Sequence, residues 1–108
     1  SNIFDYEVPR TFPSFQNSWE SYFECMYWKT KEGIVYFQGM IRGGADGTLA
    51  FTLPAGCRPT TDQLFYAHTR GGGGHRIDIY ADGRVVPNTG DSAFNLWYCL
   101  TGIFFSTR

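Results

Sequence analysis

The sequence predicts an all-β domain, a jelly-roll-like antiparallel β-sandwich of six to eight short strands. Short segments in which side chains alternate between two faces recur along the chain, and glycine, proline and asparagine turns separate them at fairly regular spacing. Aromatic residues, which suit a pleated surface, make up 19% of the chain, and thirteen glycines argue against a helix bundle. The 108 residues fit one domain with a single core.

We expect an irregular N-terminal segment to end at residue 18 and the folded head domain to begin at residue 19. Residues 1–18 carry prolines and apolar side chains without a period, so we expect an irregular lead-in that packs on the domain or links it to an upstream stalk. The head domain then spans 19–108. It opens with a strand over 22–29, which the aromatic density favours, although the spacing of Glu20 and Glu24 leaves a helical turn as the alternative.

Two predicted strands are apolar on both faces. In 34–42, Val35, Phe37 and Ile41 alternate with Ile34, Tyr36, Gln38 and Met40. In 63–69, Phe65 and Ala67 alternate with Leu64 and Tyr66. A sandwich strand normally has one wet face. These strands therefore lie deep, or a neighbouring subunit covers their outer faces.

Glycines and prolines punctuate the rest of the chain. The glycines of 43–47 permit a reversal after which 35–37 and 49–51 pair, and Pro54 and Pro59 form a corner that leaves the sheet. Residues 75–86 form a hairpin with Ile77 and Ile79 inward, around Asp82-Gly83 as a type I′ turn.

A polar loop over 87–92 follows that hairpin, and one last strand spans about 95–106. That strand places Trp97, Cys99, Ile103 and Phe105 on one face, and Gly102 marks a bulge or a close backbone approach.

These turns and strands carry a family resemblance. The run from Gly39 to Pro59 contains G-x-I-x-G-G and T-x-x-F-T-L-P-x-G-x-R-P, the stretch from Arg76 to Val85 reads R-I-D-I-Y-A-D-G-x-V, and W-x-x-L-x-G-I-x-F starts at Trp97. Together and in this order they resemble the C-terminal head domains of bacteriophage tail fibres and receptor-binding proteins, over about two thirds of the chain. Cys57 stands where that family usually has an aromatic residue.

Composition excludes several classes of function. The formal net charge of −1 gives no electrostatic attraction to nucleic acid, and no apolar run approaches the roughly 18 residues of a membrane span. Cys25, Cys57 and Cys99 are odd in number and lack metal-ligand spacing, so we expect buried, reduced thiols. The sequence has no G-x-S-x-G elbow and no marked carboxylate pair, which argues against an enzyme.

Binding residues are easier to nominate than catalytic ones. Sugars offer apolar C–H faces and hydroxyl groups, which aromatic rings and planar polar side chains recognise. His68 and His75 flank a glycine loop, but two histidines with Asp78 do not make a metal site, so we expect no metal and no cofactor. The candidate carbohydrate-binding residues are His68, His75, Arg76, Asp78, Tyr80, Asn88, Asp91 and Trp97.

The alternatives to that site are an ordinary solvated face with an Arg76–Asp78 pair, and a Trp97 in the core or in a subunit interface. The resemblance implies a homotrimeric tip domain that joins an upstream part of a tail protein. It would be assembled in the host cytoplasm, lie at the tail tip or baseplate of the virion, and attach it to a bacterial surface saccharide. A purely structural trimerising or capping module is the alternative, and a polysaccharide-trimming enzyme is a third.

Overall fold

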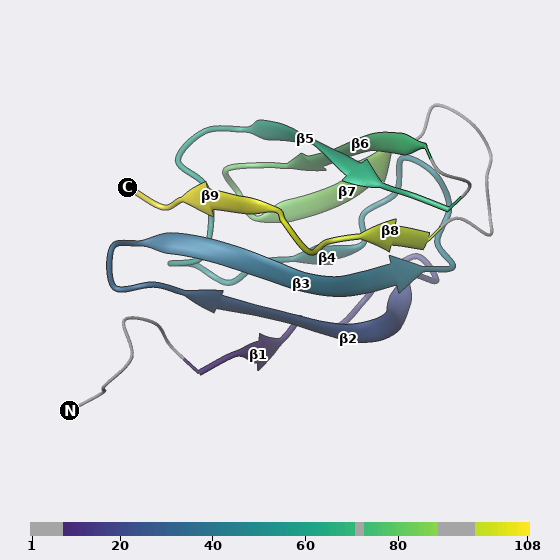
Figure 1. The fold of residues 1–108 in the computed structure, drawn as a ribbon. Helices are drawn as coiled ribbons and strands as arrows, with labels where there is room; N and C mark the ends of the chain where they lie inside the picture. Colours follow the sequence, from purple (N-terminus) through teal and green to yellow (C-terminus); the bar gives the residue numbers. More distant parts are fainter. Residues whose placement is uncertain (1–7, 71–72, 89–96) are drawn as a thin grey trace.

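The computed structural model describes residues 8–70, 73–88 and 97–108, and within them the chain folds into two antiparallel sheets (Figure 1). The first sheet holds five strands and the second holds four. The strands are β1 (Arg10–Thr11), β2 (Glu20–Lys29), β3 (Ile34–Arg42), β4 (Phe51–Thr52), β5 (Gln63–His68), β6 (Gly74–Ile79), β7 (Arg84–Asn88), β8 (Trp97–Cys99) and β9 (Phe104–Ser106). The predicted all-β sandwich is confirmed.

The five-stranded sheet is built around β3. β2 pairs with one side of β3, and the short strands β8 and β9 follow one another along the other side. The segment over 22–29 is therefore a strand rather than a helix, and 34–42 is a strand in which Val35, Phe37 and Ile41 share one face as predicted, which is the buried face. The four-stranded sheet has the order β4-β7-β6-β5, so β5 lies at its edge.

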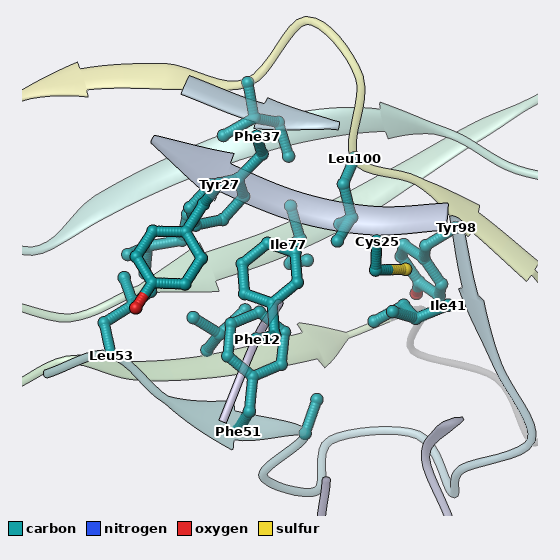
Figure 2. Close-up of a cluster of buried hydrophobic side chains, with 14 of the residues drawn as sticks. Phe12, Cys25, Tyr27, Phe37, Ile41, Phe51, Leu53, Ile77, Tyr98 and Leu100 are labelled. Carbon is teal, nitrogen blue, oxygen red and sulfur yellow. The ribbon is translucent and has the colours of Figure 1, made fainter. Parts of the chain in front are cut away.

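The core fills the space between the sheets, as Figure 2 shows for side chains from both of them. Phe12, from the predicted lead-in, packs into this core and contacts the rings of Tyr27, Phe37 and Phe51 at centroid distances of 4.4–5.1 Å. Such aromatic contacts contribute beyond the burial of their area. The end of the lead-in therefore belongs to the packed sandwich, and β1 extends the first sheet.

The glycine-rich segment 43–47 does not form the predicted hairpin. β3 pairs with β2, β8 and β9, whereas Phe51 of β4 pairs with Val85 in the other sheet. The segment instead carries the chain from one sheet to the other, with positive φ at Gly43 and Gly47. The Trp19 ring lies so close to Gly44 that a side chain there would overlap it, and Trp19 Nε1 donates a hydrogen bond to Thr48 Oγ1 at 3.1 Å.

The β6–β7 hairpin is confirmed, but its turn differs from the predicted type. Gly83 has φ +94° whereas Asp82 is not in the positive region, and Gly83 N donates to Tyr80 O at 2.8 Å. This is a type I turn followed by a glycine bulge, which suits a three-residue loop. Pro87 and Asn88, predicted to open the polar loop, belong to β7, and the other residues of that loop, 89–92, lie outside the described part of the chain.

The predicted last strand is two strands, β8 and β9, separated by a turn in which Gly102 has φ +100°. The turn shifts the alternation, so Tyr98 and Leu100 are buried while Trp97 and Cys99 are partly exposed. The prediction that Trp97 and Cys99 share one face with Ile103 and Phe105 is therefore wrong, since Ile103 and Phe105 are buried. The expectation that the Cys99 thiol is buried is also wrong.

The thiols should differ in reactivity as a consequence. Cys25 and Cys57 are buried, whereas Cys99 is partly exposed, and all three are free. Because a thiol reagent needs access to the sulfur, we expect Cys99 to react in the native protein well before Cys25 and Cys57. The thiols of Cys25 and Cys57 should become reactive on denaturation. Mass spectrometry of the labelled peptides identifies the fast site, and fast labelling of Cys25 would contradict the packing of β2.

None of the described residues forms a helix long and apolar enough to cross a membrane.

Candidate functional site

The outer surface of β5 and its neighbours, which we call the β5 face, gathers half of the candidate residues. Tyr66 pairs directly with Arg76, and Arg76 pairs with Asn88, so these three form a row across three strands. Leu64, Asp78 and Val86 form the next row. Residues directly opposite each other on neighbouring strands share one face of a sheet. We define the β5 face by Leu64, Tyr66, His68, Arg76, Asp78 and Asn88.

Tyr66 is the dominant aromatic group on this face. Its side chain is among the most exposed large apolar groups, with 80% of its surface accessible. The ring leans over Gly74 so closely that a Cβ at that position would overlap it. One side of the ring therefore lies against the Gly74 backbone, and most of its surface is open to solvent. Tyr66 is thus an exposed aromatic ring onto which a ligand could stack.

A shallow hollow of about 410 Å³ lies beside this platform, lined by Tyr66, His68, Gly73 and Gly74. The imidazole of His68 also contacts the indole of Trp97 at a centroid distance of 5.7 Å. Trp97 arrives from β8 because the two sheets meet at this end, where Thr69 bridges to Tyr98. Three aromatic groups from two sheets therefore lie near one end of the β5 face.

Asp78 faces the predicted side of β6, but it is not exposed. Only 5% of its side chain is accessible, because Arg76 and Tyr80 cover it. Arg76 Nε lies 2.9 Å from Asp78 Oδ1 in an ion pair without hydrogen-bond alignment, and Nη2 donates to Oδ2 at 3.3 Å. The Tyr80 hydroxyl donates to Oδ2 at 3.4 Å. The prediction that Asp78 is exposed for direct binding is corrected by this burial.

Tyr80 is a weaker platform than predicted. The guanidinium of Arg84 lies 4.4 Å from the centre of its ring, in cation–π geometry. Arg84 is fixed in turn by Asp82, with Nε 2.9 Å from Oδ2. The pKa of Asp82 lies below its ordinary value, chiefly because the carboxylate accepts a hydrogen bond from the Arg84 backbone N–H. The Asp82–Arg84 ion pair therefore lies against the Tyr80 ring, and Arg84 occupies the face on which a sugar would stack.

The remaining candidates divide between the two sides of the sheet. Asn88 lies beside Arg76 on the β5 face, whereas His75 pairs with the buried Ala67 and shares a 2.8 Å hydrogen bond with Thr69 Oγ1. His75 thus serves the junction of the sheets rather than the outer surface. Asp91 lies outside the described residues. Among the described residues, no group of three or more potential metal ligands converges.

The opposite sheet presents a second apolar surface, which we call the ladder face and define by Phe23, Trp28, Tyr36 and Phe104. Trp28 and Tyr36 stack at 5.8 Å, and Tyr36 contacts Phe104 at 5.6 Å. Phe23, Tyr36 and Phe104 are exposed by 36–61%. The near-parallel rings at this spacing pack against one another across the strands, so they form an apolar band rather than a flat sugar platform.

Comparison with solved structures shows the same architecture in a phage receptor binding protein. The chain matches the crystal structure of the receptor binding protein (gp15) of Listeria phage PSA with a TM-score of 0.81 and 16% sequence identity. The fold is that of a phage receptor-binding protein. The match covers 97% of this chain and 67% of the phage protein. No protein-family model matches the sequence, and no curated protein matches it.

Tyr66 is the residue of the site that the sequence analysis missed. Its strand was predicted as apolar on both faces, which pointed to subunit contact and not to a ligand platform. The available signal was the spacing of Tyr66 and His68, two positions apart on one strand and therefore on one face, next to the glycine run.

Proposed function

We propose that this domain attaches a phage virion to its host by binding a saccharide of the bacterial surface at the β5 face. The observation that carries the proposal is the exposed ring of Tyr66 beside a hollow that His68 also lines, with the Trp97 indole in contact with the His68 ring. Aromatic rings pack on the C–H faces of sugars, and Arg76 and Asn88 add planar hydrogen-bonding groups in the same row. The fold of a phage receptor-binding protein supports this function.

The domain works in this proposal as the tip of a longer tail protein, located at the tail tip or baseplate of the virion and assembled in the host cytoplasm. Shallow sites of this kind bind weakly one at a time. Several identical sites on one particle raise the overall affinity without any new contact. The domain therefore acts as a homotrimer that engages several saccharides at once.

The ladder face is the surface through which we expect the copies to meet. Its partly exposed rings offer apolar surface on the order of 300–400 Å², at most about half of what a standard interface buries on each partner. The site on the β5 face lies on the other sheet, so association through the ladder face leaves it open.

Light scattering at micromolar concentration should give three times the 12.3 kDa mass of the chain. Replacing Tyr36 by lysine should lower that mass, because it places a charge within the apolar band. A monomer for the unchanged protein would contradict the trimer.

Adsorption to purified bacterial cell walls tests the function itself. We expect the isolated domain to sediment with the walls of some strains in a panel and to release no reducing sugar from them. Failure to bind any wall, with the trimer intact, would instead support a structural capping module. Release of reducing sugar would make the protein an enzyme.

A further inference from the structure

The buried ion pair of the β5 face suggests which saccharides the site accepts. Arg76 is about half exposed, with 49% of its side chain accessible, while the carboxylate beneath it is almost completely covered. Asp78 engages Nε and Nη2 of the guanidinium. An arginine has five N–H donors, so others remain to reach a ligand that lies on Tyr66.

We propose that Asp78 is a positioning residue that fixes Arg76 and cancels its charge, so that the β5 face selects a neutral saccharide over an anionic one. This inference rests on the proposed function. A ligand hydroxyl accepts a hydrogen bond from the fixed guanidinium without needing a net charge. A phosphate or carboxylate bound at the same place would face the negative charge of Asp78 just behind the guanidinium, in a site partly shielded from water.

The neighbouring charges agree with a neutral surface. Arg84 is balanced by Asp82 at 2.9 Å, so the second arginine of this sheet face is also paired. Arg70 follows the end of β5 near Trp97, to which its backbone N–H donates. Because Arg70 could attract anions independently, Arg70→Gln is examined in parallel.

The salt dependence of wall binding gives one test. We expect the full chain to bind its wall with less than about a twofold change in affinity between low and high NaCl, because neutral ligands are insensitive to screening. Asp78→Asn keeps the size of the side chain and removes its charge. It should weaken wall binding by about tenfold, because the guanidinium loses its charged partner. The matched control Asp82→Asn changes the same charge at a carboxylate that is 58% exposed, and it should bind as the parent does.

Inorganic sulfate gives a second test that does not depend on finding a wall. The NMR signal of Arg76 Nε–H should show no saturable shift when millimolar sulfate is added to the parent protein. The same titration should saturate for Asp78→Asn, whose Arg76 is no longer neutralised, and leave Asp82→Asn unchanged.

Saturable sulfate binding at Arg76 of the parent protein would overturn the inference. So would wall binding that weakens steeply as the salt concentration rises, if it does so both in the parent and in Arg70→Gln. If Asp78→Asn fails to fold, these two measurements on proteins that keep Asp78 still decide it. If no wall is bound at all, the proposed function fails, while the sulfate titration still tests whether the site is neutral.

Discussion

Replacing Gly39 by alanine should destabilise the domain much more than replacing Gly102 by alanine, although the two backbones are alike. Their φ angles are +99° and +100°, so the strain of a side chain at positive φ is the same. They differ in their surroundings. A Cβ at Gly39 would lie 2.6 Å from the Glu24 carbonyl oxygen and 2.7 Å from Cys25 Cα, whereas nothing lies within 4 Å of a Cβ at Gly102.

The contacts at Gly39 are backbone atoms of β2, where the β2–β3 register shifts and Glu24 itself has φ +39°. A side chain cannot be accommodated there by a rotamer change, so the two central strands must separate. We expect about 1–3 kcal/mol of destabilisation for Gly102→Ala, from strain alone. For Gly39→Ala we expect about 2–3 kcal/mol more, because overpacking adds to the same strain.

Thermal unfolding followed by circular dichroism compares the two variants. At about 5 °C per kcal/mol for a domain of this size, the Tm of Gly39→Ala should lie at least 10 °C below that of Gly102→Ala. Equal melting temperatures would mean that β2 does not approach β3 as closely as described.

Tyr66→Ala should produce the largest loss of binding. Removing a central aromatic contact costs about 2 kcal/mol or more, which is roughly a 30-fold loss at each site. In a trimer the loss multiplies across the sites that engage together. Adsorption to a wall that binds the parent should therefore fall below detection. Since Tyr66 is 80% exposed, melting temperature and oligomer mass should stay close to those of the parent.

Leu64→Ala is the matched control for that variant. Leu64 lies on the same strand and the same face, is 64% exposed, and does not line the hollow beside Tyr66. It should bind within about threefold of the parent, as most interface residues outside a hot spot do. Full binding by Tyr66→Ala would place the receptor site elsewhere on the domain.

The strands could be predicted because period-two alternation and turn residues are local properties of the sequence. Val35, Phe37 and Ile41 alternate with outward residues whichever strand lies beside them. Asp82-Gly83 favours a reversal of the chain both in a two-residue type I′ loop and in the three-residue loop that is observed. The pairing of 49–51 could not be predicted in this way. Whether Phe51 pairs with β3 or with Val85 depends on contacts between distant segments, and the glycines of 43–47 permit either course.

The candidate site was predicted in part for the same reason. Alternation places Arg76 and Asp78 on one face, and they do share it. Alternation does not tell how deeply a side chain is covered, and Asp78 is buried by its own neighbours on that face. The meeting of His68 with Trp97 required the junction of the two sheets, which a local pattern does not contain.

The most direct test of the attachment site is an NMR titration of the isotope-labelled domain with saccharide fragments released from a wall that it binds. If the saccharide binds at the β5 face, the Tyr66 ring, the Trp97 indole N–H and the Arg76 Nε–H should show saturable shifts, and the signals of Trp28 and Phe104 on the ladder face should not change. Saturable shifts confined to Trp28 and Phe104, with no shift of the β5-face signals, would contradict binding at the β5 face.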